Sequence, residues 1–211
     1  MSERRTSRRA SAGSSILELV LIVAVALGLA LAIQAFIVKP YRIPSESMVP
    51  TLEVGQRVLV NRLGMHFGDP KVGDIVVFHP PQGAEASPPN QCGEQAPPGA
   101  ACDKPTTKEA SVNFIKRVVG IPGDRISIRN GRVIRNGKLT KESFISSTCA
   151  DNTGAGCTFP KTITIPPGHY FMMGDNRGES DDSRFWGPVP KSWIIGNAFA
   201  TYWPPDRIGL L

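Results

Sequence analysis

The chain has 211 residues, a hydrophobic content of 41% and a formal net charge of +6. This length and composition allow one sizeable domain with a packed core. The positive charge is unevenly distributed, and the sequence contains no basic stripe with interleaved aromatic residues, so its composition argues against a nucleic-acid partner.

The N-terminal part of the chain combines a basic tail with a long apolar stretch. The tail, residues 1–15, has only Glu3 to balance four arginines, Arg4, Arg5, Arg8 and Arg9. The stretch from Ile16 to Val38 is almost wholly apolar, and about 20 such residues span a bilayer as a helix. It is too long for a cleavable signal peptide, and no small-x-small site follows it. We therefore predict one membrane helix at 16–38, with a cytoplasmic N-terminus and residues 39–211 outside the cytoplasm.

A segment with two serines follows, reading Ile-Pro-Ser-Glu-Ser-Met-Val-Pro-Thr-Leu. Ser45 and Ser47 lie between Pro44 and Pro50. Each proline fixes its own φ and disfavours the α region for the residue before it, which predicts an extended, stiff loop and not a helix. A stiff loop can hold a hydroxyl in the position that a nucleophile requires. The alternative is a Ser/Pro-rich loop beside a membrane with no catalytic role.

Short strands bounded by turn residues account for most of the remaining chain. The Asn130-Gly131 pair between two of them is a strong hairpin signal. We find no strong amphipathic helix outside the apolar stretch. The pattern predicts a mainly β domain that folds on itself as a barrel or sandwich. Its strands are expected at 56–61, 74–78, 113–120, 125–128, 132–135, 162–165, 169–173 and 193–203.

Two segments of this domain are predicted to lie outside the core. Residues 79–112 hold seven prolines and form a long surface loop, and residues from about 138 to 161 form an insert. Four cysteines flank loops in these segments, without the Cys-x-x-Cys spacing of a zinc site. Disulfides within each loop suit an oxidising compartment, although four cysteines allow three pairings and free buried thiols are the alternative. The two local pairs are Cys92 with Cys102 and Cys149 with Cys157.

A single lysine among apolar residues marks the segment from Phe114 to Asp124. Side chains alternate between the faces of a strand, so Lys116 has apolar neighbours on its own face. It either snorkels at the edge of the strand or is buried, in which case its pKa falls and the neutral amine can accept a proton from a serine. Ser-Lys pairs are a variant of the catalytic triad. Other nucleophile systems fit less well, because the sequence has no Gly-x-Ser-x-Gly elbow, and no catalytic or metal motif contains His66, His79 or His169.

The segment from Gly174 to Gly187 is dense in charged and hydrogen-bonding groups. A solvated acidic loop and a calcium site are alternatives, but the spacing does not fit an EF-hand loop. We instead predict an internal network, in which Asp182 pairs with Arg184 or Arg177. Ser180 would hydrogen-bond the lysine amine and orient it without adding a full negative charge beside it.

Four motifs follow the apolar stretch in a specific order. They are Pro-Ser-x-Ser-Met-x-Pro-Thr-Leu, Gly-Asp-Ile-Val-Val-Phe, Lys-Arg-Val-Val-Gly-x-Pro-Gly-Asp and Gly-Asp-Asn-Arg-x-x-Ser-x-Asp-Ser-Arg-x-Trp-Gly. In this combination the chain resembles the bacterial type I signal peptidases, which are membrane-bound serine endopeptidases with a Ser-Lys dyad. The resemblance covers nearly the whole chain except 79–112 and about 138–161. Gly178 and Glu179 stand where the family pattern often has Asp and Asn, a departure that concerns the loop and not the chemistry.

The resemblance implies a role for each residue that occupies a family position. Ser47 would be the nucleophile, Lys116 the general base, and Ser45 a hydroxyl donor to the oxyanion. Ser180 would orient the lysine. A structural acid and its supporting residues would be Asp182, Asp175, Arg177 and Arg184. Positions that match or adjoin the substrate pocket are Ile43, Met48, Leu52, Phe114 and Ile115.

The resemblance also implies a mostly antiparallel β domain with an apolar surface that touches the membrane, in a single-pass protein of the cell membrane. Its partners would be the lipid bilayer and secreted preproteins with small residues at −1 and −3 before the cut. No metal or organic cofactor is needed. A soluble Ser-Lys self-cleaving regulator is disfavoured by the stretch at 16–38, and an inactive anchored scaffold by the presence of Ser47 and Lys116. The lysine also favours the bacterial type over relatives with histidine at this position.

Overall fold

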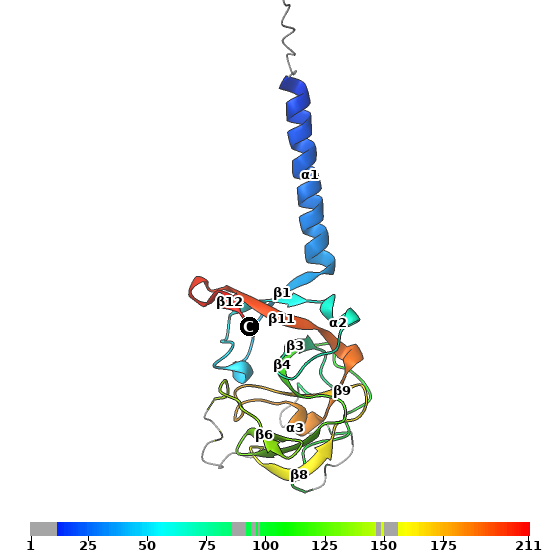
Figure 1. The fold of residues 1–211 in the computed structure, drawn as a ribbon, viewed down its shortest axis with the longest axis vertical. Helices are drawn as coiled ribbons and strands as arrows, with labels where there is room; N and C mark the ends of the chain where they lie inside the picture. The colour runs from blue at the N-terminus through cyan, green and yellow to red at the C-terminus, as the bar shows by residue number, and fades with distance from the viewer. Residues whose placement is uncertain (1–11, 86–91, 94–95, 97, 147–148, 150–155) are drawn as a thin grey trace, which may run out of the picture.

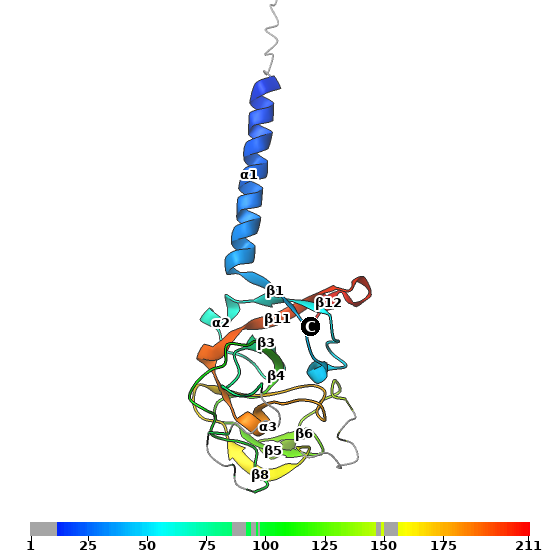
Figure 2. The same cartoon turned by 180° about the vertical axis from the view of Figure 1, so that it is seen from behind.

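The structure is a computed structural model that describes residues 12–85, 92–93, 96, 98–146, 149 and 156–211. One long helix, α1 (Ala12–Phe36), projects away from a β domain, on the side where β1 (Val38–Arg42) lies (Figures 1 and 2). Most of the predicted basic tail at 1–15 lies outside the described residues.

Helix α1 differs from the predicted helix at 16–38 in both of its bounds. It begins earlier, and it ends at Phe36 because Val38 already pairs with Asn61 of β2 (Arg57–Asn61) as the start of strand β1. The aliphatic side chains from Ile16 to Leu31 are exposed. Among the helices in the described part of the chain, none has both the length and the hydropathy needed to cross a bilayer.

The larger sheet has eight strands, in the order β1-β2-β11-β3-β4-β9-β10 with β12 paired to β11. Every strand pair in it is antiparallel. Strand β4 lies between β3 and β9, and this central place puts Lys116 inside the domain. The strands not yet bounded are β3 (Ile75–Phe78), β4 (Phe114–Gly120), β9 (His169–Met173), β10 (Val189–Pro190), β11 (Ile194–Trp203) and β12 (Gly209–Leu210).

The smaller sheet has four antiparallel strands in the order β7-β6-β5-β8. A two-residue turn joins β5 to β6, and both of its residues have positive φ, 49° at Asn130 and 72° at Gly131. This is the conformation that an Asn-Gly hairpin requires, so the predicted hairpin is confirmed. The strands are β5 (Arg125–Arg129), β6 (Arg132–Arg135), β7 (Lys138–Leu139) and β8 (Phe159–Thr164).

The mainly β, antiparallel fold class is therefore confirmed, while details of the two predicted insertions need correction. Both ends of the insert at about 138–161 extend the smaller sheet, since Leu139 pairs with Ile134 and Phe159 with Ile128. In the described part of the β domain the helices are single turns. They are α2 (Gly64–Phe67), α3 (Ser183–Trp186), η1 (Glu46–Met48), η3 (Lys191–Trp193) and η4 (Pro205–Arg207).

The prediction that 79–112 lies outside the core is wrong for several small residues. Ala100 and Ala101 pack into a buried cluster with residues of β5, such as Ile126 and Ile128. Small side chains allow this loop to approach the sheets closely, and the backbone N–H of Cys102 donates to the carbonyl of Arg184 at 2.9 Å. Among the described residues of the loop, the other buried ones are Pro80, Pro81, Ala84, Cys102 and Ala110.

Both local cysteine pairs are joined in the structure. The Cα atoms of Cys92 and Cys102 are 5.5 Å apart, and those of Cys149 and Cys157 are 5.7 Å apart. Of the three possible pairings, the structure therefore has the one in which each bond closes its own loop.

Candidate active site

The loop with two serines is more compact than the sequence indicates. Residues 46–48 form one turn of 3-10 helix, in which the backbone N–H of Val49 donates to the carbonyl of Glu46 at 3.0 Å. Val49, which precedes Pro50, is extended as expected, with φ −64° and ψ 137°. The prolines therefore restrict the ends of the segment, and residues 46–48 in its middle remain free to turn. This corrects the prediction of a wholly extended loop.

Only part of the predicted pocket lining faces the cleft. Ile43, Phe114 and Ile115 line it. Met48 and Leu52 are fully buried in the apolar cluster behind the loop, together with residues of β2 such as Val58 and Val60. These two side chains hold the turn at 46–48 against the sheet, and so stabilise the position of Ser47.

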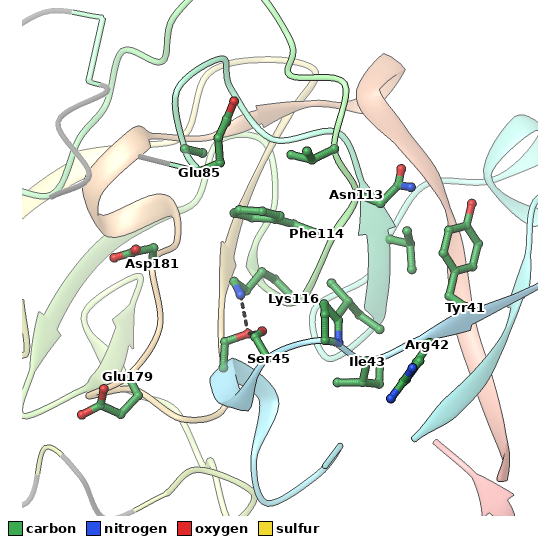
Figure 3. A pocket seen from close by; sticks show the side chains of 16 residues that line it. Tyr41, Arg42, Ile43, Ser45, Glu85, Asn113, Phe114, Lys116, Glu179 and Asp181 are labelled. Atoms are coloured by element: carbon green, nitrogen blue, oxygen red, sulfur yellow. Dashed lines mark hydrogen bonds between the residues drawn. The ribbon is translucent and has the colours of Figure 1, made fainter. Parts of the chain in front are cut away.

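Lys116 and Ser47 both line the cleft and are in direct contact, and the dashed line that leaves Lys116 in Figure 3 marks the hydrogen bond between them. The Nζ of Lys116 donates a hydrogen bond to the Oγ of Ser47 at 2.6 Å. Both residues are buried, with relative exposures of 4% for Lys116 and 6% for Ser47. Of the two interpretations of this lysine, the structure contains the buried one, because β4 is a central strand and the apolar side chains around it exclude water.

Burial lowers the pKa of Lys116 from 10.5 to about 8, because the protein interior disfavours the ammonium form. The negative charges of Asp182 and Asp181 oppose this shift, and the positive charge of Arg184 assists it. With a pKa near 8, roughly a tenth of the lysine is neutral at pH 7. A neutral amine at this distance can accept the proton of a serine hydroxyl.

The cleft itself has a volume of about 600 Å³ and an uneven lining (Figure 3). Apolar side chains line it near Ile43 and Ile115, whereas three carboxylates, from Glu85, Glu179 and Asp181, line another part. Burial and the nearby charge of Asp182 raise the pKa of Asp181. The cleft therefore offers an apolar surface next to the Ser47–Lys116 pair.

The hydroxyl of Ser45 lies beside the Ser47–Lys116 pair. Its Oγ is 3.3 Å from the Oγ of Ser47, and Ser45 is exposed to the cleft.

The segment at 174–176 holds the turn at 46–48 in place through hydrogen bonds from Asn176. The backbone N–H of Asn176 donates to the carbonyl of Ser47 at 3.0 Å, and its side-chain amide donates to the carbonyl of Glu46 at 3.1 Å.

Asp182 is the centre of a buried network under the lysine. Its carboxylate accepts hydrogen bonds from the backbone N–H of Gly174 at 3.0 Å, from the hydroxyl of Ser180 at 2.9 Å and from the guanidinium of Arg184 at 2.8 Å. Burial alone would raise the pKa of Asp182, but the charge and hydrogen bonds of Arg184 outweigh that effect and lower it. Of the two predicted partners the structure selects Arg184, and it directs the Ser180 hydroxyl to Asp182 instead of Lys116.

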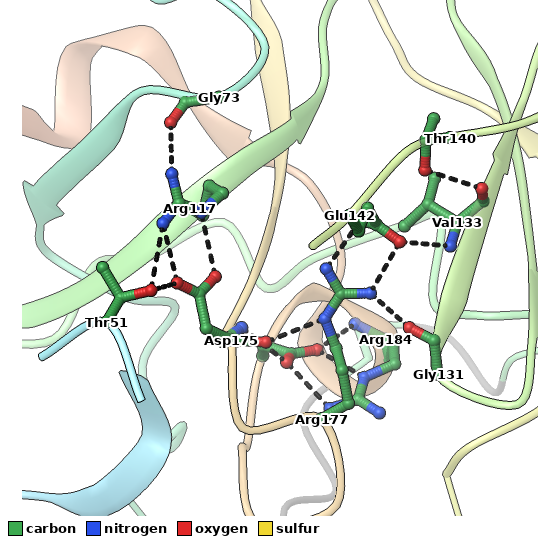
Figure 4. A network of polar contacts seen from close by, with 12 residues as sticks. Thr51, Gly73, Arg117, Gly131, Val133, Thr140, Glu142, Asp175, Arg177 and Arg184 are labelled. Atoms are coloured by element: carbon green, nitrogen blue, oxygen red, sulfur yellow. Dashed lines mark hydrogen bonds and ion pairs between the residues drawn. The ribbon is translucent and has the colours of Figure 1, made fainter. Parts of the chain in front are cut away.

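Arg177 belongs to a different pair, which the sequence did not indicate. Its guanidinium binds Glu142 at 2.7 Å and also contacts the carbonyl of Gly131 (Figure 4). Glu142 lies in the predicted insert, where no motif distinguishes it from an ordinary exposed acid. The sequence therefore does not indicate that Glu142 is buried, with 5% of its surface exposed.

A second unpredicted pair joins the serine loop to β4 (Figure 4). Asp175 accepts from Arg117 at 2.7 Å and from the hydroxyl of Thr51 at 2.5 Å. Arg117 is adjacent to Lys116 in the sequence, and a second cation in a buried strand is the signal that predicts such a partner.

Among the described residues, no group of three His, Cys, Asp or Glu is placed to hold a metal ion.

Gly174 lies where any side chain would disturb the site. A Cβ at this position would overlap the carbonyl oxygen of Ser47 and the side chain of Ser180. Misplacing a catalytic group by about 1 Å can cost about 10²-fold in rate, so we expect Gly174→Ala to lower kcat/KM by at least that factor. The matched control is Gly209→Ala, because a Cβ at Gly209 meets no atom within 4 Å. Unchanged kcat/KM in Gly174→Ala would show that close packing at this glycine does not hold Ser47 in place.

Comparison with known proteins defines the class of enzyme to which the chain belongs. The family described as "Signal peptidase, peptidase S26" matches residues 16–203, which makes the protein a serine peptidase, a hydrolase. Signal peptidase I from Leptolyngbya laminosa is 37% identical over 200 residues, covering 95% of this chain and 86% of the relative. Probable signal peptidase I-1 from Synechocystis is 37% identical, covering 89% and 82%. Signal peptidase IB from Staphylococcus aureus is 32% identical, covering 90% of both chains. The chain belongs to the signal peptidase family, peptidase S26.

Proposed function

We propose that this protein is a type I signal peptidase, with Ser47 as nucleophile and Lys116 as general base, that removes signal peptides from secreted preproteins after small residues at −1 and −3. The observation that carries the proposal is the 2.6 Å hydrogen bond between a buried lysine and a serine hydroxyl inside the cleft. Family membership supports the activity, and the geometry supports the assignment of its two central residues.

The chemistry proceeds in two halves. Neutral Lys116 takes the proton of Ser47 Oγ, which attacks the scissile carbonyl, while the Ser47 N–H and the Ser45 hydroxyl donate to the developing oxyanion. The C–N bond breaks as the Lys116 ammonium gives its proton to the leaving amine. Lys116 is then neutral again and activates a water molecule, which hydrolyses the ester on Ser47 and releases the signal peptide.

The substrate residues at −1 and −3 are placed against the apolar part of the cleft. Ile43, Phe114 and Ile115 reduce the space there and offer no hydrogen-bonding groups, which suits alanine-sized side chains. Neither −1 nor −3 then needs a charged partner from the enzyme.

Membrane attachment belongs to the same proposal. The apolar sequence and exposed aliphatic side chains of α1 support a single anchor, and the arginines before it support a cytoplasmic N-terminus. Elements α2, β11 and β12 lie in the part of the β domain near α1 (Figure 1). These elements and the residues that join β11 to β12 expose large apolar side chains, which would rest on the bilayer. They are Phe67, Trp203, Ile208 and Leu210.

The test of function is cleavage of a purified preprotein by the purified full chain in neutral detergent. A preprotein with alanine at −1 and −3 is expected to be cut once, after −1, as read by N-terminal sequencing of the product. The matched substrate with leucine at −1 is expected to remain uncut. Failure to cut the alanine substrate, or equal cutting of both, contradicts the proposal. Self-cleavage of the enzyme without substrate would favour the self-cleaving alternative.

The two serines are expected to differ in importance. Loss of one oxyanion donor costs about 10²–10³ in rate, so Ser45→Ala should retain weak activity, while Ser45→Thr keeps a hydroxyl and should recover much of it. The measurement is kcat on one preprotein. The role assigned to Ser45 is wrong if Ser45→Ala is as inactive as Ser47→Ala, or as active as wild type.

A further inference from the structure

A second cavity, of about 380 Å³, lies at the smaller sheet and shares no lining residue with the Ser47–Lys116 cleft. Strands β6 and β8, which mark this sheet, are at the end of the molecule opposite α1 (Figure 1). The lining contains two guanidinium groups and no carboxylate. Its residues are Arg129, Asn130, Arg132, Leu139, Ile145, Ser146 and Cys149.

The two arginines are directly opposite each other, where β5 and β6 meet the hairpin turn. Like charges in directly opposite positions of a β-ladder destabilise it. Within the described part of the chain, neither Arg129 nor Arg132 forms an ion pair that would offset this repulsion, whereas Arg135 on the same hairpin binds Asp124 at 3.2 Å. A pair of uncompensated positive charges at a cavity is the arrangement that an anion would stabilise.

The backbone that carries these arginines is held firmly. The N–H of Gly131 donates to the carbonyl of Cys157 at 2.7 Å, and the N–H of Asn130 donates to the hydroxyl of Thr158 at 3.2 Å. The carbonyl of Gly131 also accepts from Arg177 (Figure 4). Because the turn is fixed before any ligand arrives, little ordering of the backbone would oppose binding.

We propose that this cavity binds a phosphate monoester with a short apolar substituent. A phosphate dianion has three acceptor oxygens and nearly two negative charges, which match two guanidinium forks better than a carboxylate does. The hydroxyl of Ser146 is a further donor in the lining, and the side chains of Leu139 and Ile145 provide an apolar surface for the substituent. This site is separate from the proposed peptidase site.

The test uses the full chain in neutral detergent, with ¹⁵N-labelled arginine and butyl phosphate as the probe at constant ionic strength. We expect saturable shifts of the Nε–H resonances of Arg129 and Arg132, which are assigned from the variants themselves. Arg129→Gln and Arg132→Gln should each weaken binding by about tenfold, the effect of losing a charge-assisted hydrogen bond. Arg125→Gln is the matched control, because Arg125 is exposed on the same strand but does not line the cavity. It should bind as wild type does.

Three comparisons complete the experiment. Inorganic phosphate and butyrate should both bind more weakly than butyl phosphate, and butanol should leave the arginine resonances unchanged. Equal weakening in Arg125→Gln would show diffuse attraction by the surface and overturn the proposal, as would shifts caused by butanol or the absence of saturation. Without anion, Arg129→Gln and Arg132→Gln should have the Tm of wild type or a higher one, since each removes a like-charge contact. A lower Tm would also contradict the proposal.

Discussion

Ser47→Ala is expected to lower kcat by about 10⁶-fold, the loss typical of removing the nucleophile of a serine protease. The side chain removed is small and the turn at 46–48 is held by Met48, so the fold should be unchanged. The measurement is single-turnover cleavage of one preprotein, with Tm as the control for folding. A folded Ser47→Ala protein that cuts within about tenfold of the wild-type rate would assign the nucleophile elsewhere.

Lys116→Arg is expected to be as inactive as Lys116→Met, although it keeps the positive charge. A guanidinium stays protonated at any pH at which the protein is folded, so it cannot accept the Ser47 proton. Methionine keeps most of the volume of the lysine and removes the charge. Both variants are assayed for kcat/KM on the same preprotein, with Tm to show that they are folded. Near-normal rates in Lys116→Arg would mean that position 116 supplies only charge.

The same lysine makes stability depend on pH in a defined direction. Its pKa in the folded protein, about 8, is below its ordinary value of 10.5, so the folded state disfavours the proton. The free energy of unfolding should therefore fall as the pH falls from about 10.5 to about 8, and this contribution should be constant below that range. Lys116→Met should lack this dependence and be more stable than wild type at neutral pH.

Sequence reasoning located the strands better than it located the loops. Two strands, β6 and β9, have the predicted bounds, because a glycine lies directly before each of them, Gly131 before β6 and Gly168 before β9. The start of β8 at Phe159 was missed because Pro160 and Lys161 do not look like part of a strand. Long-range pairing with β5 decides that boundary, and local sequence does not contain that information.

In the candidate site, too, local sequence predicts some features, whereas others depend on residues that are distant in the chain. The buried lysine was one of two possibilities in the sequence, because alternation predicts its neighbours but not whether β4 is central or at an edge. The choice of Arg184 over Arg177 as the partner of Asp182 depends on Glu142, which approaches from 35 residues earlier in the chain. The 3-10 turn at Ser47 depends on the buried anchors Met48 and Leu52, whose environment forms only in the folded domain.

The most direct test of the account is the pH dependence of kcat/KM for the wild-type protein on one preprotein. This parameter reports the pKa values of the free enzyme, so it should rise by about tenfold per pH unit below a pKa of about 8 and level off above it, as neutral Lys116 accumulates. An acid limb near the ordinary pKa of a carboxyl group or a histidine, or a flat profile from about pH 6 to about pH 10, would contradict a lysine base.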